Sequence, residues 1–413
     1  MAERILHYPK QFLNQVDIAL HHLSQNYRLI KKFAGDKPIM GVIKSDAYGH
    51  GLVECARVLI EEGVAHLGVQ DVYEGVALRD AGIKAQQVYV MSGLDYPSQI
   101  TLAAERDLVI FVYSREQLVN IINLAQVRSF NIKVMLKIDS GMGRLGMPER
   151  EVMPFLQQAY AAPSVQVMGL ATHLATISDA KAVEQLNLFQ HLIKRSEDVI
   201  QAPLVSSALS GGSLLAHPEY PDGLPRVGLA LYGVGPPPES LKNPVPYKGK
   251  DTGGEDSLFP HVEPKKPTHH ASGLSILEKL KPVMRVSSTI IQLKRLRKGD
   301  SVSYDRIFVA PNDMFVAIIP FGYANGLHSS RSEKNCALIK GHRVEQIGKV
   351  CMNLTAFDVS ALTGVKPGDE VVLLGESGEE KLDAYHEYFP EKCNPYELLC
   401  HYGRLNRKFF HKS

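Results

Sequence analysis

The stretch "LVIFVYSREQLVNIINLAQVRSFNIKVMLKID" (108–139) decides the fold, because one short run contains a strand pattern, a helix pattern and a second strand pattern. Its two ends are continuous apolar runs rich in β-branched residues, which are typical of strands buried on both faces. Its middle, "REQLVNIINLAQ", spaces apolar residues near i, i+3 and i+4, as an amphipathic helix does. The stretch therefore predicts a βαβ unit with parallel strands.

Comparable units recur from about residue 13 to residue 240, with helical patterns such as "LVECARVLIEEG" and "AVEQLNLFQHLIKR" between apolar runs. The expected strands are residues 38–44, 65–70, 88–93, 108–113, 132–139, 165–174, 203–210 and 227–234. Eight parallel strands alternating with helices predict a closed (β/α)8 barrel of the TIM type, and an open, doubly wound sheet is the alternative.

The pattern changes after residue 240. Residues 235–273 are rich in proline, glycine and charge, which indicates a linker or surface insertion, and short strand patterns separated by turns then predict an all-β domain. The "THH" at 268–270 could be proposed as a metal site, but it lacks nearby cysteine or carboxylate spacing, so a solvated linker is favoured. We expect a barrel at 1–240, an insertion at 241–273 and a β domain at 274–413, with the first 12 or so residues able to pack on the β domain.

Composition excludes several classes of protein. The 413 residues carry 46 basic and 44 acidic side chains, a net charge of +2, so no basic stripe points to nucleic acid or a membrane surface. No signal-peptide pattern and no run of eighteen apolar residues is present, which makes the cytoplasm the expected compartment. The five cysteines show no CxxC spacing, so we expect free thiols and no metal site.

Polar residues stand where the expected barrel strands end, which is the side where barrel enzymes carry their active sites. They are Lys44, Lys137 with Arg144 in the loop after it, His173 and Ser210, with Arg226 at the start of the last strand. A strand-end lysine such as Lys44 can simply reach solvent over apolar surface. Alternatively, a dry and partly cationic site would lower the pKa of its amine, which could then form a Schiff base.

The segment "SSALSGGSLL" (206–215) also has two readings. Small hydroxyl residues and paired glycines at a helix start can form a nest of N–H groups for a phosphate, or they can make an ordinary helix N-cap. A phosphate nest together with a Schiff-base lysine suggests pyridoxal 5'-phosphate as the cofactor.

The sequence resembles the alanine racemase family, whose members are fold-type III pyridoxal-phosphate enzymes. "VIKSDAYGHG" (42–51) is similar to the cofactor-lysine signature, and further motifs stand in the family's order. These motifs are "EGVALRDAGI" (74–83), "LKIDSGMGRLGM" (136–147), "GLATHLATISD" (169–179), "PRVGLALYG" (225–233), "GDSVSYDRIF" (299–308), "IPFGYANG" (319–326) and "GKVCMN" (348–353).

The resemblance implies interconversion of L- and D-alanine by two bases, with D-alanine used for peptidoglycan. Lys44 would hold the cofactor and act as one base, and Tyr304 from the partner subunit of a head-to-tail homodimer would be the other. Racemisation needs this arrangement, because one group removes the α-proton and another returns it on the opposite face.

The resemblance also assigns residues around the cofactor and the substrate. It implies that Arg226 donates to the pyridine nitrogen, which stays largely unprotonated because guanidinium keeps its proton. His173 and Arg226 would help the tyrosine base to lose its proton, Arg144 and Met352 would bind the substrate carboxylate, and Lys137 is at a position that is often carbamylated. The positions implied around the cofactor phosphate are Tyr48, Ser210, Gly228 and Leu229.

Several residues depart from the family pattern. Asp46, Leu209, Asn325 and Asn353 replace residues that are usual there, and Arg404 stands roughly where a phosphate-contacting tyrosine is found, with Tyr402 nearby. Alternatives therefore stay open: a serine or broad-specificity racemase, a fold-type III decarboxylase of basic amino acids, and a non-catalytic pyridoxal-phosphate carrier. A pocket discriminates a methylene by only about 1–3 kcal/mol, so the choice between alanine, serine and larger amino acids stays open.

Overall fold

A computed structural model describes residues 13–93, 96–248, 272–384 and 394–412. Residues 1–12, which we expected could pack on the β domain, and residues 249–271 of the expected insertion lie outside this range. The described residues form two compact units. The barrel unit comprises His22–Ala47 and Leu52–Lys281, and the β unit takes its described residues from Met1–His21, Tyr48–Gly51 and Pro282–Ser413.

The barrel unit contains eight parallel strands in sequence order around the sheet, with β9 beside β2. Ser210 and Arg226 form a parallel bridge, which links the end of the β8 segment to β9 and completes the ring. The expected barrel is confirmed, and the open sheet is wrong. The strands are β2 (Met40–Val42), β3 (His66–Val69), β4 (Gln87–Val90), β5 (Leu108–Val112), β6 (Ile132–Lys137), β7 (Val165–Ala171), β8 (Val205–Ser207) and β9 (Arg226–Val227).

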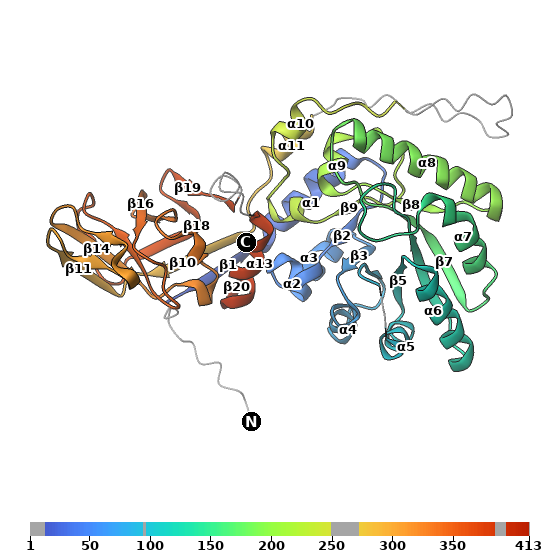
Figure 1. The fold of residues 1–413 in the computed structure, drawn as a ribbon, viewed down its shortest axis with the longest axis horizontal. Coiled ribbons are helices and arrows are strands. Elements are labelled where there is room, and N and C mark those ends of the chain that lie inside the picture. Colours follow the sequence, from blue (N-terminus) through green and yellow to red (C-terminus); the bar gives the residue numbers. More distant parts are fainter. Residues whose placement is uncertain (1–12, 94–95, 249–271, 385–393, 413) are drawn as a thin grey trace. The chain divides into compact units, whose positions relative to one another are not determined.

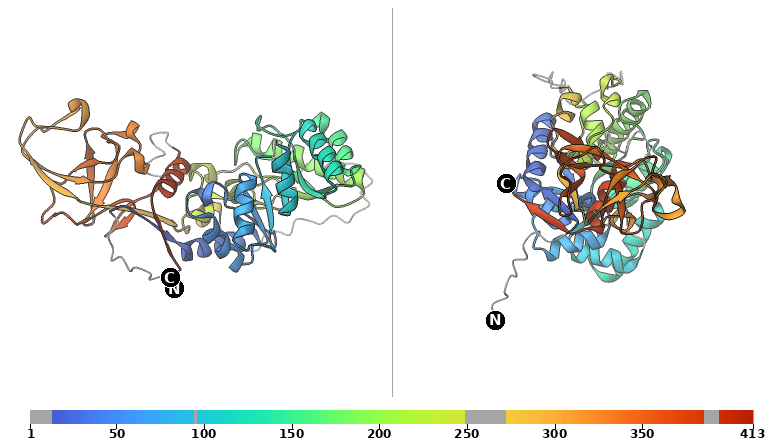
Figure 2. Two further views of the ribbon diagram at one scale, coloured as in Figure 1. Left: turned by 90° about the horizontal axis from the view of Figure 1, so that it is seen from below. Right: turned by 90° about the vertical axis from the view of Figure 1, so that its left-hand side faces the viewer.

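Helices alternate with these strands and lie outside them (Figures 1 and 2). Side-chain N-caps fix several starts, as where Asp71, Ser114 and Asp179 accept backbone N–H bonds in the first turn of α4, α6 and α8. The helices are α1 (Leu20–Ala34), α3 (Leu52–Glu61), α4 (Val72–Asp80), α5 (Pro97–Glu105), α6 (Arg115–Arg128), α7 (Val152–Tyr160), α8 (Ala180–Ile200), α9 (Gly211–Ala216), α10 (Glu239–Lys242) and α11 (Gly273–Leu277). None of the described helices is long and apolar enough to span a lipid bilayer.

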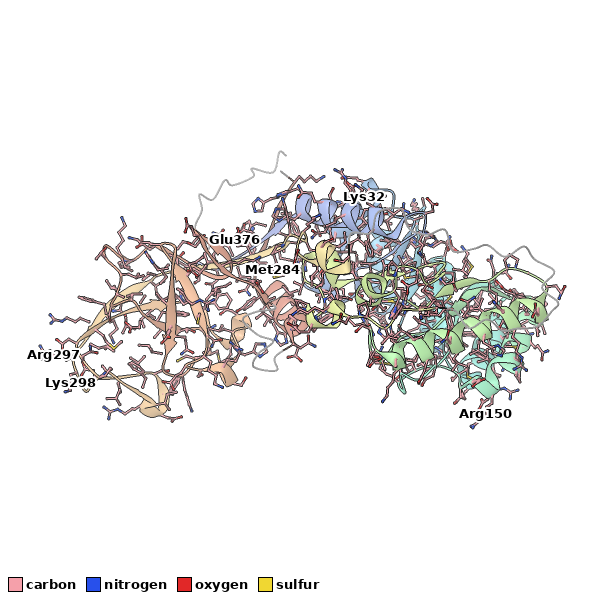
Figure 3. All side chains as sticks on the ribbon, turned by 90° about the horizontal axis from the view of Figure 1, so that it is seen from above. Lys32, Arg150, Met284, Arg297, Lys298 and Glu376 are labelled. Carbon is pink, nitrogen blue, oxygen red and sulfur yellow. The ribbon has the colours of Figure 1, made fainter. Side chains whose placement is uncertain are left out.

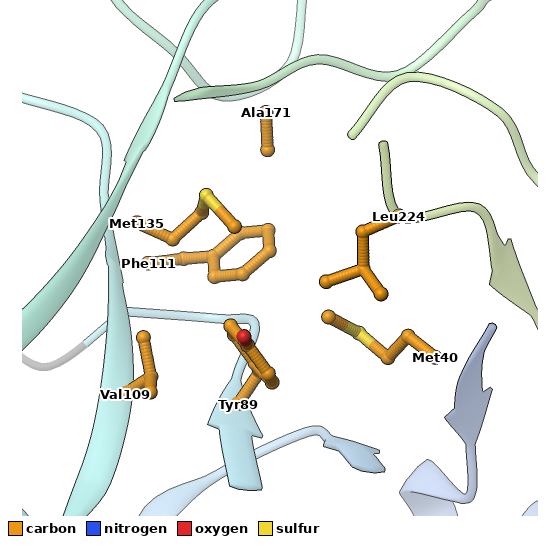
Figure 4. Close-up of a cluster of buried hydrophobic side chains, with 7 residues drawn as sticks. All are labelled: Met40, Tyr89, Val109, Phe111, Met135, Ala171 and Leu224. Atoms are coloured by element: carbon orange, nitrogen blue, oxygen red, sulfur yellow. The ribbon is translucent and has the colours of Figure 1, made fainter. Parts of the chain in front are cut away.

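The inside of the barrel is packed with side chains from successive strands (Figure 4). Tyr89 of β4 meets Phe111 of β5 edge to face, with ring centroids 6.4 Å apart. Because side chains fill the interior, a substrate cannot bind there, and functional groups are expected at the ends of the strands. The buried cluster comprises Met40, Tyr89, Val109, Phe111, Met135, Ala171 and Leu224.

The β unit is an extended, mainly antiparallel sheet with one added hairpin. Its strands are β1 (Gln15–Ala19), β10 (Met284–Thr289), β11 (Gln292–Leu296), β12 (Ser301–Val302), β13 (Phe308–Val309), β14 (Met314–Ile319), β15 (Cys336–Ile339), β16 (His342–Ile347), β17 (Thr355–Asp358), β18 (Glu370–Ser377), β19 (Glu380–Leu382) and β20 (Lys408–His411), and its helix is α13 (Pro395–Leu405). β1 pairs antiparallel with β10 and parallel with β20, so both ends of the described chain contribute to one sheet.

The exposed cations that Figure 3 labels lie on different elements. Lys32 lies in the last turn of α1, Arg150 lies in a short 3₁₀ turn before α7, and Arg297 with Lys298 occupies the turn after β11.

Candidate active site

The barrel strands deliver the expected polar residues at their carboxyl ends. Lys44 comes two residues after β2, Lys137 is the last residue of β6, His173 comes two residues after β7 and Ser210 comes three residues after β8. Carboxyl ends of the strands lie on one face of a barrel, and active sites of this fold are found there. The sequence predicted that these residues follow or end barrel strands, and the strands of the structure end at or within three residues of each of them.

Arg226 is the central group of this face. It begins β9, is 6% exposed, and donates from Nη1 to the backbone oxygen and the hydroxyl of Ser207 at 2.6 and 2.7 Å. Its Nη2 donates to the backbone oxygens of Thr172 at 2.6 Å and Ala208 at 3.3 Å. The guanidinium therefore ties the loops after β7 and β8 together, and burial lowers its pKa to about 10, which leaves it protonated at neutral pH.

His173 accepts a hydrogen bond from Arg226. The Nη2 of Arg226 lies 3.2 Å from Nδ1 of His173. An arginine is always the donor, so Nδ1 is the acceptor and the imidazole proton is assigned to Nε2. Burial and then the charge of Arg226 lower the pKa of His173 to about 2, so this imidazole is neutral at physiological pH.

Cations dominate the surroundings of His173. After Arg226, the basic side chains of Lys137, Arg144 and Lys44 further lower its pKa, which places four basic side chains within electrostatic reach of one imidazole. Burial, Arg226 and Arg144 also hold the pKa of Lys137 well below its ordinary value, although Asp139 opposes them. Such an excess of positive charge favours an anion such as a phosphate or a carboxylate, and it favours neutral amines over ammonium groups.

Lys44 begins a left-handed turn, labelled α2 (Lys44–Tyr48) and here called the lysine turn. Ser45, Asp46, Ala47 and Tyr48 have φ values of 57, 57, 54 and 54°. For residues with a Cβ atom this conformation costs about 1–2 kcal/mol each. Strain of this kind persists only where surrounding contacts hold it, and it is concentrated at functional sites. No sequence pattern predicted it.

Ser210 is a helix N-cap, as one of its two readings proposed. Its side chain accepts from the backbone N–H of Ser213 at 3.4 Å, and its own N–H donates to the Ser213 hydroxyl at 2.7 Å. The helix start lies against the β9 segment, since a Cβ atom added to Gly211 would be 3.4 Å from Val227 and 4.0 Å from the nitrogen of Gly228. The start of α9 therefore lies beside the segment at residues 227–228.

Asp222 supports the same loop and was missed from the sequence. Its side chain is buried, and its two oxygens accept the N–H groups of Ala208 and Leu209, each at 2.9 Å. Burial raises the pKa of Asp222 to about 6, although these bonds and Arg226 oppose the shift. In the sequence Asp222 stands in an ordinary turn pattern, "PDG", so nothing marked it as a buried group.

Tyr304 is presented by a strained hairpin of the β unit. It comes two residues after β12, is 68% exposed, and lies between Ser303 with φ 69° and Asp305 with φ 57°. The hydroxyl of Ser303 donates to the backbone oxygen of Lys349 at 2.7 Å, and the side chain of Lys349 pairs with Asp305. The turn is therefore fixed from both sides while the phenol of Tyr304 remains accessible.

Met352 lies in a neighbouring exposed segment of the β unit. The backbone oxygens of Cys351 and Met352 accept the N–H groups of Tyr323 and Ala324 at 3.0 and 2.9 Å. Met352 is 56% exposed, and the Ser303 hydroxyl lies 3.2 Å from the sulfur of Cys351. The motifs "SVSYDR", "FGYANG" and "GKVCMN" therefore come together at one edge of the β unit.

Tyr48 belongs to the β unit, although it lies only four residues after Lys44. It is buried, and its ring lies 5.9 Å from that of Tyr396 in α13. Burial and then the charge of Tyr396 raise the pKa of Tyr48.

Among the described residues, no group of three histidine, cysteine or acidic side chains could hold a metal ion. The expected "THH" segment lies outside those residues.

Two family models match the chain. The N-terminal domain of alanine racemase matches residues 18–236, and its C-terminal domain matches residues 283–409. The chain belongs to the alanine racemase family. The family's enzymes are isomerases, and the resemblance read from the motifs is confirmed.

Individual members match this chain over most of its length. Alanine racemase of Sorangium cellulosum is 34% identical over 373 residues, which are 87% of this chain and 88% of that protein. The crystal structure of alanine racemase from Streptomyces lavendulae is 25% identical, covers 98% of both chains and has a TM-score of 0.84. Alanine racemase from Bartonella henselae, 20% identical with 97% and 100% coverage and a TM-score of 0.78, shares the fold and contains covalently bound pyridoxal phosphate.

Proposed function

We propose that this protein interconverts L- and D-alanine with pyridoxal 5'-phosphate and two bases, Lys44 and Tyr304 of the partner subunit. The observation that carries the proposal is the placement of Lys44 at a strand end among cations that surround the Arg226–His173 pair. Membership of the alanine racemase family supports the same reaction. We further propose that the enzyme works in the cytoplasm and supplies D-alanine for peptidoglycan.

The residues of the barrel unit fit this cofactor. The excess of positive charge near His173 suits its phosphate and phenolic oxygen, and the start of α9 beside residues 227–228 offers main-chain groups to a phosphate. The Nε–H of Arg226 has no hydrogen-bond partner among the described residues, so it is the donor that remains for a ring nitrogen. When bound, pyridoxal phosphate withdraws electrons from the α-carbon of an amino acid and makes its hydrogen acidic.

The protein's own side chains then handle the substrate and the proton. The Nζ of Lys44 takes or returns the α-proton on one face, and Arg144, which is exposed at the same face of the barrel, binds the carboxylate. Arg226 donates without losing its proton, since its pKa of about 10 keeps it charged. Carbamylation of Lys137 remains part of the proposal, and its low pKa supports it because a carbamate forms on the neutral amine.

Tyr304 supplies the second base from a neighbouring subunit in this proposal. The exposure of Tyr304 and Met352 on a rigid edge of the β unit supports a role in completing a site on another chain. The oxygen of Tyr304 would serve the face of the α-carbon opposite Lys44, and the main chain at Met352 would help to bind the carboxylate. Tyr48, which is buried with its ring near that of Tyr396 in α13, is also proposed as a phosphate contact.

Hydrogen exchange at the α-carbon in deuterated water tests the two-base assignment. The wild-type enzyme should form each enantiomer from the other with solvent deuterium at the α-carbon. The variant Tyr304→Phe should exchange the α-hydrogen of only one enantiomer and form little of the other, because one base remains. Lys44→Ala should lose both the cofactor absorbance band and racemisation. Wild-type rates in both directions for Tyr304→Phe would refute the assignment.

A substrate panel decides the specificity. Initial rates with L-alanine should exceed those with serine, lysine and larger amino acids, and no carbon dioxide should be released from diamino acids. Higher rates with serine or lysine would instead indicate a shifted racemase, and carbon dioxide release would indicate a decarboxylase. Cofactor binding without turnover of any amino acid would indicate a carrier.

A further inference from the structure

Two carboxylates link the lysine turn to neighbouring elements, one from outside the turn and one from within it. The Oε1 of Glu74 accepts the N–H of Asp46 at 2.8 Å, and the Oε2 of Glu74 accepts the N–H of Gln70 at 2.8 Å. The Oδ1 of Asp46 in turn accepts the N–H of Leu52, the first residue of α3, at 2.8 Å. The turn is therefore bonded in two ways. Its main-chain N–H at Asp46 donates to Glu74, and its own Asp46 side chain accepts the first N–H of α3.

These contacts link the turn to rigid elements. Gln70 comes directly after β3, and Glu74 lies in the first turn of α4, whose start is fixed by the N-cap Asp71. β3 is the neighbour of β2, the strand that ends just before Lys44. The carboxylate of Glu74 therefore links the N–H of Asp46, two residues beyond Lys44, to the N–H of Gln70 at the end of β3.

We propose that Glu74 and Asp46 are positioning residues that hold the lysine turn in its left-handed form and so fix the direction of the Lys44 side chain. This inference rests on the proposed role of Lys44 as cofactor lysine and base. An amine that must reach an aldehyde and then an α-proton needs a fixed origin, because small displacements of a reacting group lower rates steeply. Neither acid acts on the substrate itself.

The two acids differ in what they must supply. Glu74 uses both oxygens as acceptors, so an amide would place an –NH2 donor against a main-chain N–H. The contact of Asp46 with Leu52 uses one oxygen, which an asparagine also has. At this contact, Asp46 and the asparagine of the alanine racemase pattern therefore offer the same kind of acceptor.

Hydrogen exchange of the chain without added cofactor tests the contacts directly. In Glu74→Gln, the amide of Asp46 or of Gln70 should exchange at least about tenfold faster, because it loses a hydrogen bond to a charged acceptor. In Asp46→Ala, the Leu52 amide should do the same, whereas Asp46→Asn should keep it near the wild-type rate. The control is Ser114→Ala, which removes the N-cap of α6 and lowers thermal stability without touching the turn.

Cofactor affinity, measured by equilibrium dialysis with pyridoxal phosphate, tests the positioning role. Glu74→Gln and Asp46→Ala should bind at least about tenfold more weakly, a loss of about 1.4 kcal/mol. Asp46→Asn and Ser114→Ala should stay within about twofold of wild type. Wild-type affinity in Glu74→Gln and Asp46→Ala would overturn the proposal, and equal weakness of Asp46→Asn and Asp46→Ala would overturn the role of the Asp46 oxygen.

Failure of this inference is distinguishable from failure of the proposed function. If the wild-type chain neither binds pyridoxal phosphate nor racemises alanine, the proposed function is wrong. The exchange rates of the Asp46, Gln70 and Leu52 amides still report whether the two carboxylates hold the turn, and unchanged rates in the variants would overturn that claim.

Discussion

At the scale of residues, the Arg226–His173 contact determines the charge of the site. Arg226 keeps its proton and donates to Nδ1, and burial among cations keeps the imidazole neutral. His173 could be identified from the sequence by its place after a strand, but its protonation could not. That property depends on Lys137, Arg144 and Lys44, which approach it only in the fold.

The neutral state of His173 predicts a pH dependence of stability. The unfolded chain binds a proton there below its ordinary pKa of 6.5, whereas the folded chain does so only near 2, so stability falls as the pH falls below 6.5. The slope for one proton is at most about 1.4 kcal/mol per pH unit. His173→Asn keeps an acceptor for Arg226 but does not titrate.

Urea unfolding without cofactor, at pH 7.5, 6.5 and 5, measures this difference. From pH 7.5 to 5, the wild type should lose about 2 kcal/mol more unfolding free energy than His173→Asn. Other titrating groups are common to both proteins and cancel in the comparison. Parallel pH profiles for the two proteins would contradict the neutral-histidine assignment.

At the scale of elements, the apolar pattern predicted that strands exist more reliably than it predicted their exact lengths. The strand expected at 227–234 is only Arg226–Val227, and Leu229–Tyr232 forms a 3₁₀ turn after Gly228. A continuous apolar run cannot distinguish a buried strand from a buried helical turn. The left-handed lysine turn and the Asp222 loop were not predictable either, because each depends on contacts between distant segments.

The loop between β8 and α9 should depend on Asp222. Asp222→Asn would place an amide donor against the N–H of Ala208 or Leu209 in a buried site, so one of the two 2.9 Å bonds is lost. An unsatisfied buried group costs about 1–3 kcal/mol, and the variant should lose that much unfolding free energy in urea together with affinity for pyridoxal phosphate.

A matched control for this variant is Asp80→Asn. Asp80 forms an exposed ion pair with Arg106 at 2.5 Å, and exposed pairs contribute about 0–1 kcal/mol. Equal destabilisation by the two variants, or full cofactor affinity in Asp222→Asn, would argue against a supporting role of Asp222 at the loop.

At the scale of the whole molecule, the sequence of the barrel unit interrupts the sequence of the β unit. β1 precedes the barrel strands and pairs with β10 and β20, which come after them in the chain. The alternation of strands and helices predicted the barrel, but pairing of residues near 15 with residues near 410 is too distant in sequence for periodicity to reveal. The groups proposed for catalysis are divided between the units, with Lys44, Arg144 and Arg226 on one and Tyr304 and Met352 on the other.

A hybrid dimer tests whether one site uses both chains. Lys44→Ala and Tyr304→Phe subunits, each inactive alone, can be co-expressed with different tags and purified through both. If Tyr304 serves the partner's Lys44, one of the two sites in the hybrid has both bases, and about half of the wild-type activity per dimer should return. Each variant homodimer purified in the same way is the control. If both bases came from one chain, each site of the hybrid would lack one of them, and no activity would return. The rate of D-alanine formation by the hybrid therefore distinguishes a site shared between two chains from a site within one chain.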